Sequence, residues 1–337
     1  MASKKIFVTG GAGYIGSHCV LSLLSNGYKV VIFDNLSTGH KEIIDILCQY
    51  GEIDFIHGDL NVFTNICDAF ERHNDIEAVL HLAAFSQVAE SMHIPAKYYR
   101  NNLCGTINLL DAMIKYHINK LVFSSTAATY GEPIYTPIDE EHPQNPINTY
   151  GKTKLMIEKI MDDYDLAYSL KSVRLRYFNV AGADHNTRIG EWHTPETHLI
   201  PNILKSVLNN TYLFNIYGTD YDTPDGTCIR DYINVEDLAT AHMLSLDYLL
   251  NGGETNFFNL GTTKGCSVKE IFNICEKITK QSISLKVKPR REGDPAVLVA
   301  DNTKEKKILS WTPVRNINET IESAFRWEKK LYKLINK

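Results

Sequence analysis

The sequence lacks the long apolar run that a membrane-spanning helix needs, since no stretch approaches about 18 consecutive apolar residues. Near its start only residues 6–8 are apolar before a glycine-rich turn, which is too short for the core of a secretory signal peptide. Its net charge is −5, from 35 basic and 40 acidic side chains, so it lacks the basic excess that favours non-specific binding to nucleic acids or anionic membranes. These absences predict a cytoplasmic protein with no nucleic-acid and no membrane partner.

Cysteine and histidine are present, but not in metal-binding or disulfide patterns. The seven cysteines contain no C-x-x-C pair and are odd in number, which favours free thiols in a reducing compartment. None of the 12 histidines falls into H-E-x-x-H or a comparable spacing. We therefore expect no metal site.

Apolar strand segments alternate with helical segments through the first half of the chain. The predicted strands are residues 5–9, 29–33, 53–57, 77–82, 120–124 and 172–177, and the predicted helices include residues 14–26, 62–72, 97–116 and a helix from about 150. Strands separated by helices in this order form parallel pairs through right-handed crossovers. The sequence therefore predicts an α/β fold with a doubly wound parallel sheet of the Rossmann type.

The 337 residues are enough for two domains, on a prior of roughly 100–200 residues per domain. From about residue 181 the strand–helix rhythm breaks into irregular sequence with aromatic residues and turns. We predict a large domain of residues 1–180 plus about 233–262, and a smaller mixed α/β C-terminal lobe of about 181–232 plus 263–337. Within the large domain, four prolines mark residues 131–148 as a long loop, which is usually either functional or disordered.

Glycines 10, 13 and 16 follow the first strand and open the first helix in the spacing G-x-x-G-x-x-G. Such glycines allow a tight turn and let a pyrophosphate approach the backbone at the helix N-terminus. Asp34 ends the next strand, 18 residues after Gly16, where an acid accepts hydrogen bonds from an adenosine ribose. A carboxylate there repels a 2′-phosphate, so the pattern predicts NAD rather than NADP.

Tyr150 and Lys154 are four residues apart, so they share one face of the predicted helix. A free tyrosine titrates near pH 10, and we expect Lys154 together with an oxidised nicotinamide to lower that value toward a working range. The same spacing also occurs on solvent-exposed helices. Thr126, just after the strand at 120–124, adds a hydroxyl at the edge of the sheet where ligands bind, although hydroxyl residues at strand ends are often only turn formers.

Together these segments resemble the extended short-chain dehydrogenases/reductases, and within them the enzymes that invert C4 of UDP-hexoses. The resemblance covers nearly the whole chain and rests on residues 10–16, 33–39, 126–131, 176–179, 230–232 and 291–294, and on Tyr150-x-x-x-Lys154.

The resemblance implies, by position, that Thr126 and Tyr150 form a hydroxyl pair at the sugar and that Lys154 is their electrostatic and ribose-binding partner. Positions that match NAD contacts are Gly10, Gly13, Tyr14, Ile15, Gly16, Asp34, Asn35, Asp59, Leu60, Ala83, Asn102, Tyr150, Lys154 and Tyr177. Positions that match substrate contacts are Thr126, Tyr150, Asn179, His198, Leu199, Asn215, Tyr217, Arg230, Arg291, Asp294 and Leu298. Two residues depart from the pattern, because relatives have lysine in place of Ser86 and asparagine in place of His198.

The implied activity is that of an NAD-dependent isomerase of galactose metabolism. Tyr150 takes the proton of the C4 hydroxyl beside Thr126, and the C4 hydride passes to tightly bound NAD. The transient 4-keto sugar then rotates about its phosphate linkage and presents its other face before proton and hydride return. UDP-galactose and UDP-glucose would interconvert in this way.

Other functions of the same fold stay open. A 4,6-dehydratase is disfavoured, because Ala127 and Ala128 follow Thr126 where that reaction needs proton-transferring groups. A decarboxylase or epimerase of UDP-glucuronate remains, as does a catalytically silent NAD-binding regulator, although an intact Thr126, Tyr150 and Lys154 argue against the regulator.

Substrate breadth and assembly are further expectations. Leu298 stands where some relatives have tyrosine, and it leaves more room for an N-acetyl group at sugar C2. We therefore expect UDP-GalNAc and UDP-GlcNAc as further substrates, unless Leu298 only packs beside its neighbours. The resemblance also suggests a homodimer through residues 97–116 and 150–166.

Overall fold

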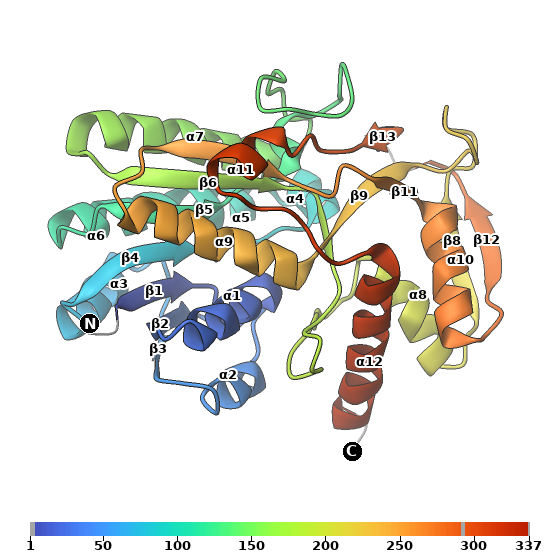
Figure 1. The fold of residues 1–337 in the computed structure, drawn as a ribbon, viewed down its shortest axis with the longest axis horizontal. Helices are drawn as coiled ribbons and strands as arrows, with labels where there is room; N and C mark the ends of the chain where they lie inside the picture. The colour runs from blue at the N-terminus through green and yellow to red at the C-terminus, as the bar shows by residue number, and fades with distance from the viewer. Residues whose placement is uncertain (1–3, 291–293, 336–337) are drawn as a thin grey trace.

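The computed structural model describes residues 4–290 and 294–335. Its larger part is a seven-stranded parallel sheet in the order β10-β6-β5-β4-β1-β2-β3 (Figure 1). The strands are β1 (Lys5–Thr9), β2 (Lys29–Asp34), β3 (Ile53–His57), β4 (Ile76–His81), β5 (Lys120–Ser124), β6 (Lys171–Tyr177) and β10 (Asn256–Leu260). Strand order reverses on either side of β1, which pairs with both β2 and β4. The predicted doubly wound α/β fold is confirmed.

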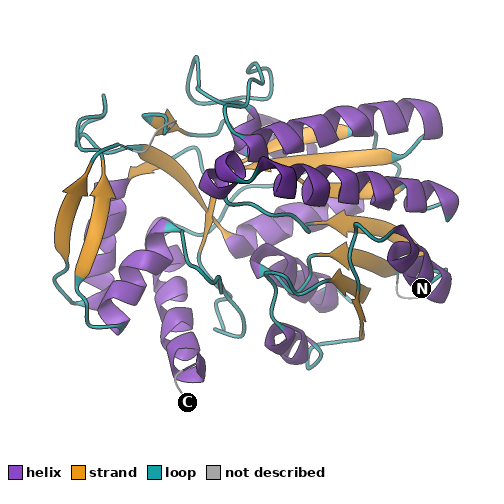
Figure 2. Cartoon of the chain, turned by 180° about the vertical axis from the view of Figure 1, so that it is seen from behind, coloured by secondary structure: helices purple, strands orange, loops and turns teal. Residues whose placement is uncertain are grey.

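Helices cover both faces of this sheet (Figures 1 and 2). On one face lie α1 (Tyr14–Ser25), α2 (Lys41–Leu47) and α9 (Val235–Leu250), and on the other lie α3 (Phe63–Arg72), α6 (Gly105–Lys115) and α7 (Thr149–Tyr168). Because successive residues of a strand point to opposite faces, Val8 enters the core under α1 and α9, and Phe7 the core under α3 and α6. No helix in the described part of the chain is both long and apolar enough to cross a membrane.

The segment expected to form one helix at 97–116 is divided in the structure. After α4 (Val88–His93) and α5 (Pro95–Tyr98), residues Tyr99–Cys104 form a π-helix that leads into α6. A short 3₁₀ turn, η2 (Ala127–Thr129), precedes the proline-rich loop at 131–148. That loop is anchored by Ile138, whose main-chain N–H donates to Val299 and whose carbonyl accepts from Asp301, each at 2.8 Å. The loop thereby joins the large sheet to the smaller lobe.

The smaller lobe lies beside the carboxyl end of the sheet (Figure 1). One of its sheets contains β7 (Asn179–Ala181), β9 (Ile229–Asn234), β11 (Gly265–Ser267) and β13 (Val297–Leu298), and the other pairs β8 (Leu213–Tyr217) with β12 (Ser284–Lys288). Its helices are α8 (Leu199–Leu208), α10 (Val268–Thr279) and α12 (Ile317–Ile335). The short helix α11 (Thr303–Ile308) packs instead on β10 of the large sheet, where Lys304 Nζ donates to the main-chain oxygen of Phe257 at 2.8 Å. An apolar core joins α8, α10 and α12, while α9 and β10 return to the large sheet.

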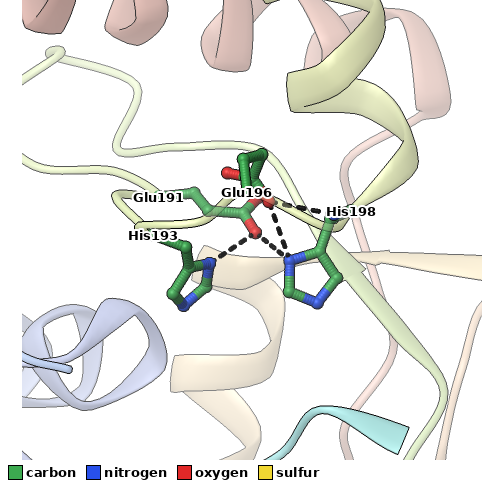
Figure 3. A group of neighbouring side chains, drawn as sticks. All are labelled: Glu191, His193, Glu196 and His198. Atoms are coloured by element: carbon green, nitrogen blue, oxygen red, sulfur yellow. Dashed lines mark hydrogen bonds and ion pairs between the residues drawn. The ribbon is translucent and has the colours of Figure 1, made fainter. Parts of the chain in front are cut away.

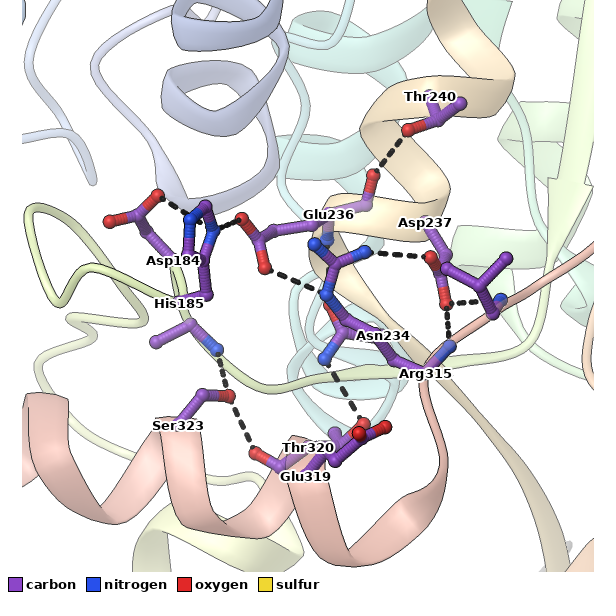
Figure 4. Close-up of polar contacts among 12 residues, drawn as sticks. Asp184, His185, Asn234, Glu236, Asp237, Thr240, Arg315, Glu319, Thr320 and Ser323 are labelled. Atoms are coloured by element: carbon purple, nitrogen blue, oxygen red, sulfur yellow. Dashed lines mark hydrogen bonds and ion pairs between the residues drawn. The ribbon is translucent and has the colours of Figure 1, made fainter.

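Polar contacts connect the start of α9 to the segment around α12 (Figure 4). Asn234 caps α9 by accepting a 2.9 Å hydrogen bond from the Glu236 N–H, and its amide donates to Thr320 at 3.1 Å. Arg315 pairs with Asp237 at 2.9 Å. These contacts hold α12 against α9, the helix that leads from the smaller lobe back to the large sheet.

Candidate active site

A cavity of about 500 Å³ lies beyond the carboxyl ends of β1, β2, β4 and β5. Ligands of open α/β sheets bind at this edge, where the strand order reverses. The smaller lobe supplies the opposite wall, through the start of α8, Arg230 of β9 and Leu298 of β13. The cavity is therefore shared between the large sheet and the smaller lobe.

Most of the residues predicted from the sequence line this one cavity. They are Gly10, Gly13, Tyr14, Ile15, Gly16, Asp34, Asn35, Asp59, Leu60, Ala83, Thr126, Tyr150, Lys154, Tyr177, Asn179, His198, Leu199, Arg230, Asp294 and Leu298.

Three of the predicted residues do not line the cavity, and a fourth lies outside the residues that the structure describes. The buried Asn102 exchanges two 2.9 Å hydrogen bonds with the main chain of Phe85, and so fixes a segment that does line the cavity. Asn215 and Tyr217 belong to β8, away from the cavity lining. Arg291 lies outside the described residues.

The glycine turn leaves the start of α1 bare toward the cavity. Gly10 has a left-handed φ of +73°, and a Cβ on Gly16 would stand 2.0 Å from the Gly10 carbonyl oxygen. Gly13 caps α1 without any side-chain hydrogen bond, and a Cβ there would meet only the Gly10 oxygen, at 3.4 Å. Unpaired N–H groups at a helix start attract phosphate, so this turn fits a dinucleotide diphosphate that occupies the space a side chain at 13 would fill.

Asp34 faces the same cavity and is held by two main-chain donors. Its Oδ2 accepts from Ala12 at 3.0 Å and its Oδ1 from Leu36 at 2.8 Å. Burial raises the pKa of Asp34, while these two hydrogen bonds act in the opposite direction. Each oxygen keeps room for a second donor, so the carboxylate can bind ribose hydroxyls. The residues present thus fit NAD.

Tyr150, Thr126 and Lys154 meet at the end of β5. The side chain of Asn148 accepts a 2.8 Å hydrogen bond from the Gly151 N–H and so begins α7 beside that strand. A hydrogen bond joins the side chains of Tyr150 and Thr126. Lys154 lies one turn further along α7, and its Nζ donates to the main-chain oxygen of Ser124 at 2.7 Å.

Burial controls the charge of these groups. It raises the pKa of Tyr150 to about 12, although the hydrogen bond with Thr126 acts to lower it. Burial also lowers the pKa of Lys154 to about 7, against the attraction of Glu158. The protein alone therefore does not bring Tyr150 to a working range, and the expected lowering of its pKa requires more positive charge in the cavity.

On the side of the smaller lobe, Arg230 is already engaged by the protein. Its guanidinium donates to the carbonyls of Ile229 at 2.9 Å and Pro295 at 2.8 Å, and to Asp294 at 3.3 Å. Arg230 and Asp294, both predicted to contact substrate, are thus partners of each other.

Comparisons with known proteins agree with this architecture. A family model described as GDP-mannose 4,6 dehydratase matches residues 7–324. The chain is 47% identical over 330 residues to the UDP-glucose 4-epimerase of Rhizobium meliloti (strain 1021), a match that covers 98% of each chain. The chain belongs to the UDP-glucose 4-epimerase family.

Solved structures of the UDP-glucose 4-epimerase family are similar over the whole chain. The Bifidobacterium longum enzyme in complex with NAD+ and UDP has a TM-score of 0.93 at 37% identity, with 97% of this chain and 98% of that chain covered. The UDP-Glc/GlcNAc 4-epimerase from Campylobacter jejuni has a TM-score of 0.85 at 41% identity, with 97% and 100% covered.

Two small side chains of the cavity bear on the 4,6-dehydratase alternative. Ala127 and Ala128 both line the cavity directly after Thr126. A methyl side chain cannot transfer a proton, so the acid and base that dehydration needs are missing from these two positions. A 4,6-dehydratase activity therefore remains disfavoured for this chain.

One group of cavity residues was missed by the sequence analysis. Glu191, His193 and Glu196 surround His198, the only one of the four that was predicted (Figure 3). All lie in the loop between β7 and α8, and three of them line the cavity. The concentration of two glutamates and two histidines within residues 191–198 could have indicated this group from the sequence.

Proposed function

We propose that this protein interconverts UDP-galactose and UDP-glucose by inverting C4 of the hexose, with NAD retained in the cavity. The hydrogen-bonded pair of Tyr150 and Thr126 carries the proposal, because it places a proton acceptor and a second hydroxyl on the wall between the glycine turn and the smaller lobe. The division of labour between an NAD-binding domain and a UDP-sugar-binding lobe is part of the same proposal.

The residues of this chain would act as follows. Gly13 and the start of α1 would hold the NAD diphosphate, and Asp34 an adenosine ribose. Tyr150 would remove the C4 hydroxyl proton and later return it, with Thr126 hydrogen-bonded to the same oxygen. When bound, NAD supplies the hydride acceptor and donor for C4, and its oxidised nicotinamide adds the positive charge that favours a Tyr150 phenolate.

Incubation of the purified protein with UDP-galactose, without added NAD, tests the proposal. We expect UDP-glucose to accumulate until the two sugars reach equilibrium, as followed by proton NMR. A folded sample that contains NAD yet converts neither sugar would contradict the proposal. Release of CO₂ from UDP-glucuronate under the same conditions would favour the decarboxylase instead.

We also propose that N-acetylated UDP-hexoses are substrates. Leu298 lines the cavity and presents a branched aliphatic side chain rather than an aromatic ring. The similar Campylobacter jejuni protein is named a UDP-Glc/GlcNAc 4-epimerase, which supports this breadth. Conversion of UDP-GalNAc to UDP-GlcNAc, separated by chromatography, is the corresponding measurement.

A cytoplasmic homodimer completes the proposal. None of the seven cysteines, all of which the structure describes, is joined in a disulfide, which supports a reducing compartment. On α7, the apolar side chains of Met156 and Leu166 remain 41% and 90% exposed, which leaves surface for a second copy. Sedimentation of the unmodified protein as a dimer, and of Leu166→Glu as a monomer, would support this assembly; a monomer in both cases would contradict it.

A further inference from the structure

The loop before α8 gathers two carboxylates and two imidazoles on the cavity wall (Figure 3). Glu191 Oε1 lies 2.6 Å from Nδ1 of His198 and 3.2 Å from Nδ1 of His193. Glu196 Oε1 lies 3.3 Å from Nδ1 of His198. His198 therefore faces two carboxylates through one ring nitrogen.

Glu196 is fixed in place by the main chain. Its Oε1 accepts hydrogen bonds from the N–H groups of Thr197 at 2.8 Å and His198 at 2.9 Å. Glu191 is buried, with only 6% of its side chain exposed. Neither carboxylate can turn to water without breaking these contacts, so both stay directed at the imidazole.

The other side of the His198 ring is open. Within the described residues, every hydrogen bond and ion pair of this ring uses Nδ1. In Figure 3 the second ring nitrogen, Nε2, points away from both carboxylates. The side chain lines the cavity and is 47% exposed, so Nε2–H is available to a ligand.

Charged and titratable groups from three helices and the loop itself face this cluster. Lys205 of α8 lies 3.2 Å from Glu196, and the buried Glu328 of α12 lies 4.0 Å from Lys205. The Tyr14 ring of α1 contacts the His193 ring edge-on, with ring centres 6.2 Å apart. Lys205 compensates Glu196 in part, which leaves His198 as the nearest cation for the buried Glu191.

We propose that Glu191 and Glu196 hold His198 as an imidazolium on the cavity wall, so that a position already expected from the family to contact the substrate meets the diphosphate of the UDP-sugar as a cation. This inference rests on the proposed function. His198 would be the group that touches the substrate, and Glu191 and Glu196 would be positioning residues.

Two observations favour this role for His198. Among the described residues that line the cavity, the other two cationic side chains already have protein partners, because Arg230 donates to two carbonyls and Asp294, and Lys154 donates to Ser124. His198 is also the N-cap of α8 (Leu199–Leu208), whose N-terminal dipole favours an anion at the same place. Charge-assisted hydrogen bonds are the stronger kind.

Electrostatics agree with the geometry. Burial alone would lower the pKa of His198, but the charge of Glu191 and the hydrogen bonds to both carboxylates outweigh it and raise the pKa to about 10. An ordinary histidine titrates near 6.5 and would lose its charge under neutral conditions.

The protonation state can be measured directly by NMR of ¹⁵N-labelled histidine side chains, with His198→Asn used to assign the signal. We expect the His198 ring to keep both N–H protons from pH 6 to about pH 9, and to titrate at lower pH in Glu191→Gln and Glu196→Gln. An ordinary titration of His198 in the unmodified protein would overturn the proposal. So would a zinc ion retained by these donor atoms, which lie within 4.8 Å of one another, since metal and proton compete for Nδ1.

Substrate binding tests the second half of the inference. UDP-glucose is a suitable probe because its diphosphate keeps the same charge across the neutral range. We expect its Kd for the unmodified protein to be nearly constant between pH 6 and 8.5, and its Kd for Glu191→Gln to rise roughly tenfold over that range. A Glu191→Gln protein that loses affinity equally at every pH, or not at all, would overturn the proposal.

Glu236→Gln is the matched control. Glu236 pairs with Nδ1 of His185 at 2.8 Å, a contact like that of Glu191 (Figure 4). Neither Glu236 nor His185 lines the cavity. The affinity of the Glu236→Gln protein for UDP-glucose should match that of the unmodified protein at each pH. Failure of the unmodified protein to bind UDP-glucose at any pH would contradict the proposed function as well, whereas binding without the pH response of Glu191→Gln contradicts this inference alone.

Discussion

Lys154 Nζ lies 6.0 Å from the centre of the Tyr150 ring. The ammonium group does not touch the phenol, because its 2.7 Å hydrogen bond to the main-chain oxygen of Ser124 holds it at the strand end. Burial favours the neutral form of both side chains, with a pKa of about 12 for Tyr150 and about 7 for Lys154. Tyr150 is therefore protonated at neutral pH in the protein alone, and its phenolate form needs further positive charge in the cavity.

Replacement of Lys154 by methionine should shift the pH profile of the reaction. A phenolate and an ammonium about 6 Å apart stabilise each other, so deprotonation of Tyr150 raises the pKa of Lys154 and the charged Lys154 lowers the pKa of Tyr150 by roughly 1–3 units. Loss of Lys154 should therefore move the rising limb of kcat/KM to higher pH by about one unit. Lys152→Met removes an exposed lysine from the same helix and should leave the limb in place. A limb that moves to lower pH, or stays where it is, in Lys154→Met would show that this charge does not assist Tyr150.

Tyr150→Phe should abolish most of the turnover while substrate still binds. Loss of a general base lowers the rate by roughly 10²- to 10⁴-fold, and the phenyl ring preserves the packing of the buried side chain. The control is Tyr28→Phe. The Tyr28 hydroxyl donates a 2.8 Å hydrogen bond to Asp247, and Tyr28 does not line the cavity. Steady-state kinetics should show a fall in kcat with little change in KM for Tyr150→Phe alone. Near-normal turnover would reassign the base.

The sequence predicted the parts of the site that depend on short-range order. A glycine turn after a strand, an acid at the next strand end and a tyrosine–lysine pair on one helix each occupy positions set by the periodicity of a single element. Gly13, Asp34 and Lys154 all line the cavity for that reason. The parallel sheet follows from the same alternation of elements.

Contacts between distant segments could not be predicted in this way. Asn102 falls at a family position for NAD, but the π-helix at Tyr99–Cys104 directs its amide to Phe85. The ion pair between Glu158 on α7 and Arg176 on β6 depends on how a helix settles against a strand. The cluster around His198 depends on the path of an irregular loop, where side-chain direction has no period.

Gly13→Ala should separate cofactor binding from folding. Gly13 has an ordinary negative φ, and a Cβ there meets only one atom, at 3.4 Å, so the variant should fold with the same Tm as the unmodified protein when both are freed of NAD. The added methyl group occupies the space where the diphosphate of NAD would lie. We expect the purified variant to contain much less NAD, measured as nucleotide released on denaturation.

Gly16→Ala provides the contrast. Its Cβ would stand 2.0 Å from the Gly10 oxygen, so this variant should lose stability itself, visible as a lower Tm. Full NAD content in Gly13→Ala would mean that the diphosphate does not use this turn.

Glu158→Gln should destabilise the fold by about 3–5 kcal/mol, the usual cost of removing one partner of a buried ion pair. The side chains of Glu158 and Arg176 are only 3% and 4% exposed, and the Arg176 guanidinium donates to both carboxylate oxygens. An uncompensated arginine would remain inside the protein. Denaturant unfolding measures the change, with Glu77→Gln at the exposed Lys4 pair as control, expected to cost less than about 1 kcal/mol. Equal effects in the two variants would contradict the importance assigned to burial.

Leu298→Tyr should narrow the substrate range. Leu298 packs against a buried cluster that contains Tyr130, Ile138 and Phe178, so a tyrosine ring has no space on that side and must extend into the cavity. A larger group in a closed pocket costs roughly tenfold or more in discrimination. We expect kcat/KM for UDP-GalNAc to fall at least that much further than kcat/KM for UDP-galactose. Leu298→Ala, which adds no bulk, should leave the ratio of the two substrates unchanged or shifted toward UDP-GalNAc. An equal loss for both substrates in Leu298→Tyr would show that this side chain serves packing alone.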